Sequence, residues 1–293
     1  MKGLVIKNIS DHFDVWVDSE IYTHCSARGL LKRNGRVMVG DWVDLERVGD
    51  GEYVIVNIYE RKNTLVRPLL ANLDQMLIVI SQVPEPDFLL VDKLIIKCFH
   101  LGVRPVLVIN KCDVNDKKWV NNVVGEYLPV VDNILVISSK TGENKEKLQE
   151  LIKGKVSSFV GQSAVGKSCL LNMLGVKKKA KVGDVSIKTQ RGKHTTRHSE
   201  ISVLFEDAFL VDTPGFSRLD LNEINYKELT RYYPDFEIYA KKCRYQPCSH
   251  IHEKETDCEV KKAINDCKIN QNRYNRYITI YNELKKYWEK MYV

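Results

Sequence analysis

The sequence has 293 residues, of which 44% are hydrophobic and 28% are charged, a balance that is typical of globular proteins and excludes a disordered or fibrous chain. A chain of this length predicts roughly two domains rather than one core. The net charge of +7 at pH 7 is compatible with a polyanionic partner but does not require one.

No run of the sequence approaches the roughly 18 apolar residues that a membrane-spanning helix needs, and charges interrupt residues 1–8 before a secretory segment can form. We therefore expect a soluble cytoplasmic protein without a membrane partner. A monomer is also expected. In a reducing compartment the eight cysteines do not form disulfides, so a tight Cys/His cluster is interpreted first as a metal site. Four isolated cysteines are expected to fill the core: Cys25, Cys98, Cys112 and Cys169.

Residues 1–66 carry short alternating apolar runs, separated by turn signals such as 32–35 and 49–51. This pattern predicts a small β-barrel, and an OB-type fold fits its size. Such barrels often hold nucleic acid on one face, but the pattern leaves RNA contact by this region open.

From residue 67 the pattern changes to continuous apolar strands that alternate with helices. Strands are predicted at 76–80, 106–109 and 134–137, and helices near 92–101 and 144–152. Strands that are apolar on both faces indicate a mostly parallel sheet covered on both sides. Residues 67–222 are therefore predicted to form an α/β domain.

A strand predicted at 156–160 leads directly into the sequence GQSAVGKS and then into a helix. This is the GxxxxGK[ST] phosphate loop in its strand–loop–helix context. Its backbone N–H groups can surround a polyphosphate, Lys167 can reach the β- and γ-oxygens, and the Ser168 hydroxyl can ligate Mg²⁺. The predicted phosphate-binding residues are Gly161, Gln162, Ser163, Ala164, Val165, Gly166, Lys167, Ser168 and Cys169.

Two motifs upstream of this loop predict that the base is guanine. The carboxylate of Asp113 can accept two hydrogen bonds from the guanine N1–H and N2 amine, which adenine does not offer, and the stem of Lys111 can pack along the base. A backbone amide at the end of the strand at 134–137 can bind guanine O6. The residues predicted to bind the base are Asn110, Lys111, Asp113, Ser138, Ser139 and Lys140.

The sequence DTPG at 212–215 predicts a nucleotide switch. Asp212 would hold Mg²⁺ through water and the Gly215 amide would meet the γ-phosphate, so loss of that phosphate would release the following segment. The other switch is expected at 192–197, where a threonine hydroxyl would complete the metal shell. Thr195 and Thr196 are both candidates, and Thr196 is preferred. The Mg²⁺ ligands are thus predicted to be Ser168, Thr196 and Asp212.

The order of these motifs is unusual, because the guanine motifs precede the phosphate loop, whereas in Ras-like proteins they follow it. A parallel sheet depends on which strands are neighbours more than on where the chain is cut, so a circular permutation can keep the same site. One consequence is that the DTPG switch leads straight into the C-terminal region.

Past residue 222 the strand pattern stops, and apolar residues recur at helical spacing in 260–267 and 274–288. An amphipathic helix that folds onto its own domain is favoured over one that fills a groove in a partner. Cys243, Cys248 and Cys258, with His250 or His252, place four ligands within sixteen residues. This density is typical of a closed Cys₃His zinc site with a structural role.

Positive charge concentrates between the phosphate loop and DTPG, at Lys177, Lys178, Lys179, Lys181, Lys188, Arg191, Lys193 and Arg197. A solvated face and a contact with an RNA backbone both explain such a cluster. Further basic residues on the last predicted helix could extend this surface: Arg273, Arg276, Lys285, Lys286 and Lys290.

Permuted guanine motifs between a small barrel and a Cys/His region resemble the ribosome small-subunit-dependent GTPase A family, also called RsgA or YjeQ-type, over essentially the whole chain. The matching stretches are GDWV at 40–43, then 110–113, 161–168, 192–196, 212–215 and the cysteine cluster. The resemblance implies an OB-type barrel at 1–66, a circularly permuted GTPase domain at 67–222 and an α-rich zinc-binding domain at 223–293. It also implies GTP hydrolysis to GDP and phosphate, stimulated by the small ribosomal subunit and its rRNA, late in the assembly of that subunit near its decoding region.

The resemblance also assigns individual residues. Phe216 follows the DTPG glycine, where Ras-type proteins place the glutamine that orients water, and the family instead points to His194 as the catalytic residue. His194 could alternatively be a switch residue or an RNA contact, and His198 is a weaker candidate. The family histidine lies two residues after the second cysteine, which favours His250, although its spacing to the last cysteine fits His252. Ala164 replaces the usual glycine, and alanine resists a positive φ.

Two other functions remain open. One is an RNA-binding protein in which guanine nucleotide only sets the conformation. The other is a permuted GTPase that acts on the large subunit or on a tRNA.

Overall fold

The computed structural model describes residues 1–29, 31, 36–49, 51–66, 69–176, 200–212 and 220–291. The chain divides into two compact units whose segments alternate along the sequence. The first unit comprises Met1–Asp74, Gly142–Phe159 and Gly166–Phe216. The second comprises Gln75–Thr141, Val160–Val165 and Ser217–Val293.

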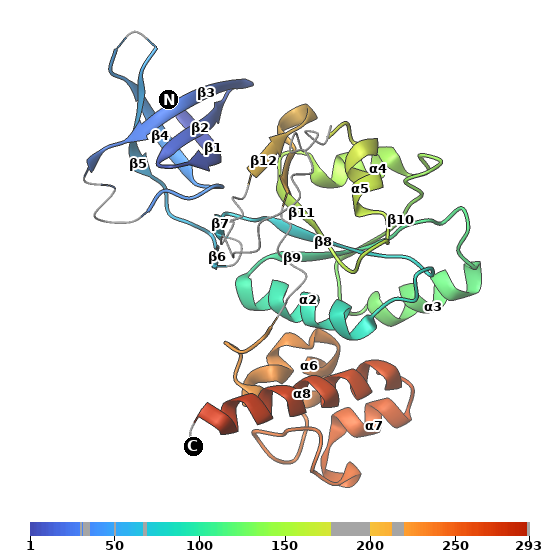
Figure 1. Ribbon diagram of the computed structural model, residues 1–293. Helices are drawn as coiled ribbons and strands as arrows, with labels where there is room; N and C mark the ends of the chain where they lie inside the picture. Colours follow the sequence, from blue (N-terminus) through green and yellow to red (C-terminus); the bar gives the residue numbers. More distant parts are fainter. Residues whose placement is uncertain are drawn as a thin grey trace, which may run out of the picture. The chain divides into compact units, whose positions relative to one another are not determined.

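The first unit begins with a closed five-stranded barrel, drawn in blue in Figure 1. Its strands are β1 (Lys2–Ile9), β2 (His12–Val17), β3 (Glu20–Ala27), β4 (Trp42–Arg47) and β5 (Tyr53–Ile58). β1 pairs with both β2 and β4, and β3 pairs with β5, so the sheet closes on itself. Alternate residues such as Phe13, Val15, Val43 and Ile55 fill its core. The barrel expected from the alternating pattern is confirmed.

The GDWV stretch forms a buried turn before β4. The carboxylate of Asp41 is fully buried, accepts a hydrogen bond from the backbone N–H of Met38 at 2.7 Å, and binds Arg61 through both oxygens at 2.7 and 2.9 Å. Gly40 has φ +88°, and a Cβ there would lie 2.0 Å from the carbonyl oxygen of Ala71. Only glycine fits this position.

A short antiparallel pair follows the barrel, β6 (Thr64–Val66) and β7 (Leu69–Ala71). The other elements of the first unit come later in the sequence: α4 (Lys145–Ile152), β11 (Val156–Val160), α5 (Lys167–Met173), β12 (Glu200–Val203), the 3₁₀ turn η1 (Phe205–Asp207) and β13 (Phe209–Asp212). β13 runs parallel to β11 and antiparallel to β12. β12 in turn pairs with β1 at Lys7 and Glu200. The Trp16 ring contacts Phe209 edge-on at 4.9 Å, so the barrel packs on the strand that leads to the predicted DTPG switch.

The second unit holds a parallel sheet of β8 (Gln75–Ile80), β9 (Arg104–Ile109) and β10 (Asn133–Val136), with α2 (Phe88–Leu101) and α3 (Lys117–Tyr127). Figure 1 shows both helices on one face of these strands. All six residues of β8 are buried, as expected of a strand covered on both faces. α2 begins earlier than predicted, because Asp87 caps it by accepting a hydrogen bond from the N–H of Leu90. Asp92, taken from the sequence as the start, is instead a buried residue inside the helix.

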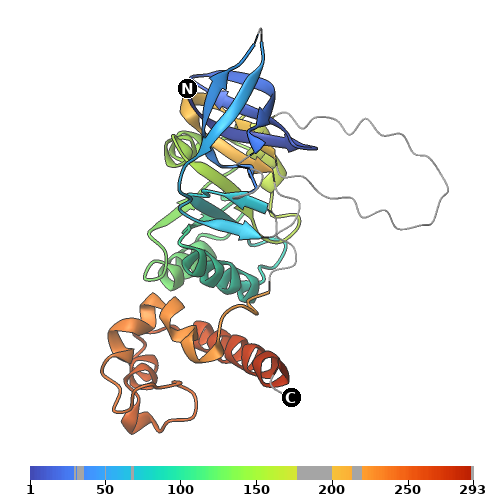
Figure 2. The same cartoon turned by 90° about the vertical axis from the view of Figure 1, so that its left-hand side faces the viewer.

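The chain ends with η2 (Tyr226–Tyr232), α6 (Pro234–Ala240), η3 (Glu255–Asp257), α7 (Glu259–Asn265) and α8 (Gln271–Met291). Tyr274, Tyr277 and Leu284 of α8 are buried in a core shared with Phe236 of α6 and Ile96 of α2. Figures 1 and 2 both place α2 between the strands of this unit and its C-terminal helices. The prediction that the last helix folds onto its own domain is confirmed.

Two expectations about single residues are wrong. Cys25 and Cys98 are buried as expected, but Cys112 is half-buried and Cys169 is exposed. The side chains of Arg273 and Arg276 are only 1% and 14% exposed, because both pair with Asp92. They therefore do not extend a basic surface. Among the helices of the described ranges, none combines the length and hydropathy that a bilayer crossing requires.

Candidate functional site

The two guanine motifs meet where β9 and β10 end. The exposed carboxylate of Asp113 accepts a hydrogen bond of 2.6 Å from the buried hydroxyl of Ser138. The same hydroxyl oxygen accepts the N–H of Thr141 at 3.1 Å. One oxygen of Asp113 is thereby oriented, while the residue as a whole remains exposed, as binding of a guanine edge requires.

The side chain of Asn110 joins both guanine motifs to the phosphate loop. It is fully buried. Its Oδ1 accepts the N–H of Ser139 at 3.0 Å, and its Nδ2 donates to the carbonyl of Val165 at 2.9 Å. Three segments far apart in the sequence therefore share one amide. This arrangement is expected if the residues that bind the base and those that bind the phosphates form one nucleotide site.

Lys111 adds a second connection to the phosphate loop. Its backbone is left-handed, with φ +63°, and its Nζ donates to the carbonyl oxygens of Ala164 at 2.9 Å and Val83 at 2.7 Å. The ammonium group thus fixes the loop, while Asp113, two positions further on, remains free to meet a base.

Backbone conformation explains the residue types in the phosphate loop. Gly161 has φ +129°, and a Cβ there would lie 2.4 Å from the carbonyl oxygen of Val79, so only glycine fits. Gly166 precedes α5 with φ +96°. Ala164 has φ +65°, the left-handed region in which the expected glycine would be unstrained. Alanine therefore adopts this left-handed conformation at a local energetic cost.

Lys167, Ser168 and Cys169 form the first turn of α5. Lys167 is half-buried, and burial lowers its pKa, while Ser168 is exposed. Lys140 is also exposed, beyond the end of β10. Asp212 ends β13, but its side chain, together with His194, Thr195, Thr196 and Gly215, lies outside the described residues. Their roles remain predictions.

Gln162 has a supporting role that the motif did not indicate. Its Oε1 accepts the N–H of Asp87 at 2.7 Å, and its Nε2 donates to the carbonyl of Glu85 at 2.8 Å. The side chain thus fastens the phosphate loop to the turn that precedes α2. The GxxxxGK[ST] pattern accepts any residue here, so the sequence carried no signal for this contact.

Four metal-ligating side chains converge in the C-terminal region. The ligand atoms of Cys243, Cys248, His250 and Cys258 all lie within 4.8 Å of one another. The sulfur of Cys258 is 3.9 Å from each of the other two sulfurs, and Nδ1 of His250 is 3.6 and 3.4 Å from the sulfurs of Cys243 and Cys258. A tetrahedral Zn²⁺ with bonds of ~2.3 Å to sulfur and ~2.05 Å to nitrogen would separate its ligands by ~3.8 and ~3.6 Å. The cluster fits zinc.

Neighbouring groups orient this cluster. His250 is 1% exposed, and burial lowers its pKa to about 4, so its imidazole is neutral at pH 7, as a metal ligand must be. The hydroxyl of Tyr274 donates to the carbonyl of His250 at 2.6 Å. Both carboxylate oxygens of Glu253 accept hydrogen bonds from Ser249. His252 is exposed and lies outside the cluster.

A phosphate loop that follows its guanine motifs, on a sheet of parallel strands, defines a circularly permuted GTPase. The family profile described as RsgA GTPase matches residues 58–222, and the RsgA N-terminal domain matches residues 2–55. The chain belongs to the RsgA GTPase family, and it is an enzyme of the GTP-hydrolysing class.

Similar proteins match this chain over almost its whole length. Proteins named small ribosomal subunit biogenesis GTPase RsgA, from Ruminiclostridium cellulolyticum and Alkaliphilus metalliredigens, are 38% and 36% identical to it, and the matches cover 97% of this chain and 93% and 98% of theirs. The crystal structure of YjeQ from Thermotoga maritima superimposes with a TM-score of 0.83 at 31% identity, covering 97% of this chain and 98% of that one. YloQ, described as a circularly permuted GTPase, gives a TM-score of 0.80 at 29% identity, covering 97% of this chain and 95% of that one.

Proposed function

We propose that this GTPase binds the small ribosomal subunit and its rRNA, assists a late step in the maturation of that subunit, and hydrolyses GTP when the subunit stimulates it, so that hydrolysis is coupled to release. The observation that carries the nucleotide part is the Asn110 side chain, which bonds to both Ser139 and Val165. The ribosomal part is supported by relatives named for small-subunit biogenesis that match over nearly their full length. Such a role places the protein in the cytoplasm, and we propose that it acts as a monomer.

Within this proposal, the base is bound by Asp113 and the end of β10, and the phosphates by residues 161–169. Mg²⁺ accompanies GTP and is held by Ser168, Thr196 and Asp212. His194 orients the attacking water, because an imidazole can accept or donate a hydrogen bond near neutral pH. One structural Zn²⁺ is bound by Cys243, Cys248, His250 and Cys258, which would crosslink a region that contains few aliphatic residues.

The test is phosphate release from GTP with no particle, with purified small subunits and with purified large subunits. We expect stimulation by small subunits only. Absence of stimulation would contradict the proposal. Stimulation by large subunits alone would favour a permuted GTPase that acts on the large subunit.

The His194→Ala and His198→Ala variants, both in the same basic segment, test which of the two candidate histidines is catalytic. Stimulated turnover should fall by ~10²-fold or more for His194→Ala, with GTP binding unchanged, as for the loss of a water-positioning group. Equal stimulated turnover by wild type and His194→Ala would show that His194 is not the catalytic residue. A protein that uses guanine nucleotide only as a conformational switch would bind GTP but show no stimulated turnover in the wild type.

A further inference from the structure

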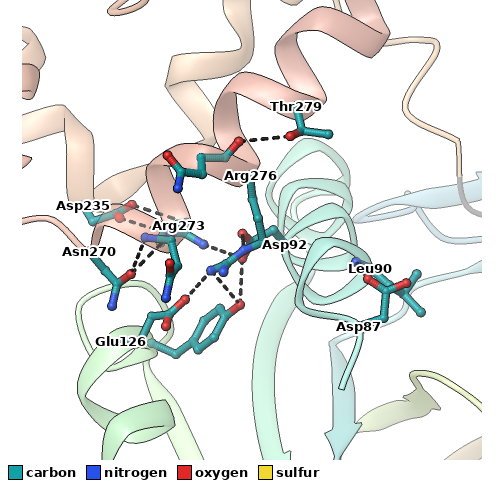
Figure 3. Close-up of polar contacts among 12 residues, drawn as sticks. Asp87, Leu90, Asp92, Glu126, Asp235, Asn270, Arg273, Arg276 and Thr279 are labelled. Atoms are coloured by element: carbon teal, nitrogen blue, oxygen red, sulfur yellow. Dashed lines mark hydrogen bonds and ion pairs between the residues drawn. The ribbon is translucent and has the colours of Figure 1, made fainter. Parts of the chain in front are cut away.

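Arg276 belongs to the C-terminal helix α8, but its guanidinium contacts the two helices that cover the sheet of the same unit. Nε donates to the carboxylate of Asp92 in α2 at 2.5 Å. Nη2 binds the carboxylate of Glu126 and the hydroxyl of Tyr127, both in α3. Figure 3 shows Arg276 reaching from α8 between these two helices. Arg276 therefore holds α2, α3 and α8 together through one planar group.

These contacts are shielded from water. The side chain of Asp92 is fully buried, and those of Glu126 and Arg276 are 12% and 14% exposed. A buried carboxylate that loses its partner carries a large desolvation penalty, so α2 is held strongly in this position. A lysine could keep the charge of Arg276 but could not bridge two carboxylates with one fork.

Arg276 also contacts the first residue of α2. Its guanidinium carbon lies 5.6 Å from the centre of the Phe88 ring, and that ring stacks on Tyr127 at 6.1 Å. Phe88 directly follows Asp87, whose N–H donates to Gln162 of the phosphate loop at 2.7 Å. A continuous set of contacts therefore connects α8 to the phosphate loop.

The neighbouring Arg273 differs in this respect. It donates to Asp92 at 2.7 Å and to Asp235 of α6 at 2.8 Å, and its guanidinium lies 4.6 Å from the ring centre of Tyr233. Outside α2 it also lies 5.8 Å from the ring centre of Tyr127 in α3, but none of its contacts within the described residues involves Phe88, the first residue of α2. Arg276 is the member of the pair that touches the start of α2.

We propose that Arg276 is a positioning residue for the phosphate loop: it fixes the first turn of α2 so that the turn at 85–87 holds Gln162, and the C-terminal region thereby sets the affinity for guanine nucleotide. The inference rests on the proposed function insofar as this loop binds guanine nucleotide. By linkage, a partner that displaces α8 would change nucleotide affinity, and nucleotide would change the affinity for that partner by the same factor.

The test is a double-mutant cycle of Arg276→Lys and Gln162→Ala, read by titration with a fluorescent GDP analogue. Arg276→Lys should raise the dissociation constant by about fivefold or more, the usual scale of coupling between sites. In the Gln162→Ala background the same change should have little further effect, because the connection is already broken. Glu283→Gln is the matched control, since it breaks the 2.5 Å ion pair between Lys93 of α2 and Glu283 of α8, and nucleotide affinity should not change.

Wild-type binding is measured first, and its absence would contradict the proposed function rather than this inference. If wild type binds and folded Arg276→Lys binds equally well, or if the effects of Arg276→Lys and Gln162→Ala add in full, the inference is wrong. Should Arg276→Lys fail to fold, Glu126→Gln removes the negative charge of one partner of Arg276 and enters the same cycle. Hydrogen exchange at the Asp87 amide should then rise in Glu126→Gln and stay at the wild-type level in Glu283→Gln, and the reverse result would overturn the inference.

Discussion

The hydroxyl of Ser138 donates a 2.6 Å hydrogen bond to the carboxylate of Asp113, so the residue predicted to select guanine is oriented by the second guanine motif. Because the Ser138 oxygen also accepts the backbone N–H groups of Lys140 and Thr141, one buried hydroxyl organises the base-binding end of the site. Asp113 is therefore held in place before nucleotide binds.

Replacing this hydroxyl should weaken guanine binding. Ser138→Ala removes the bond to Asp113 and leaves the carboxylate less ordered, which we expect to cost about 1 kcal/mol of binding free energy, or roughly fivefold in the GDP dissociation constant. Ser139→Ala is the control, because it loses only a 3.2 Å bond from Asn110 while its backbone N–H keeps the other. Equal effects of the two variants would contradict the orienting role of Ser138.

Ala164→Gly should relieve strain in the phosphate loop. Alanine at φ +65° costs about 1–2 kcal/mol, whereas the added freedom of glycine in the unfolded chain costs about 0.4–1 kcal/mol. Strain relief is the larger effect, so the variant should be slightly more stable than wild type. The backbone of Ser163 is outside the left-handed region, so Ser163→Gly relieves no strain and only increases the freedom of the unfolded chain. This variant should be less stable than wild type. Thermal unfolding of both variants measures their stabilities relative to wild type. If Ala164→Gly were less stable than Ser163→Gly, backbone strain at Ala164 would be ruled out.

Gly40→Ala should damage the barrel. The added Cβ would lie 2.0 Å from the carbonyl oxygen of Ala71, and this overlap adds about 1–3 kcal/mol to the cost of a left-handed alanine. Gly51→Ala separates the two effects, because Gly51 also has a positive φ, +78°, but has no neighbour within 4 Å of the added Cβ. Calorimetry should show a much larger destabilisation for Gly40→Ala. Similar values for both would mean that the Ala71 contact is unimportant.

Removal of the proposed zinc ion should loosen the metal cluster without abolishing nucleotide binding. After treatment with a chelator and restoration of Mg²⁺, the thiols of Cys243, Cys248 and Cys258 should react with a thiol reagent, while the buried Cys98 stays protected. Amides of α2 should remain protected from exchange, because Arg273 and Arg276 hold α8 on α2 through Asp92 and neither pair involves the metal. Loss of guanine affinity on chelation would show that the metal itself supports the nucleotide site.

The sequence predicted the elements whose signals are local. The barrel strands alternate, β8 is apolar throughout, and the phosphate loop and cysteine cluster have fixed spacings, so each could be identified from a short window. The choice between His250 and His252 depends on a left-handed backbone at His250, φ +61°, and on the distant Tyr274, which no spacing rule contains.

The buried ion network was missed because charges on a helix are usually exposed. Arg273 and Arg276 look the same in the sequence as Lys286 and Lys290 of the same helix, which are exposed. The available signal was Asp92, a carboxylate inside the apolar run of α2, which requires a buried cation. A helix that starts at Asp92, as predicted, would instead leave this carboxylate at an exposed helix end.

The most direct test of the account is the nucleotide preference of Asp113→Asn. The central claim is that motifs in permuted order build one guanine pocket in which this carboxylate meets the base. Competition between GTP and XTP for wild type and variant measures it. Wild type should prefer GTP, and the variant should prefer XTP, because an asparagine amide matches the O2 of xanthine in place of the guanine amine. An undiminished preference for GTP in folded Asp113→Asn would contradict the account.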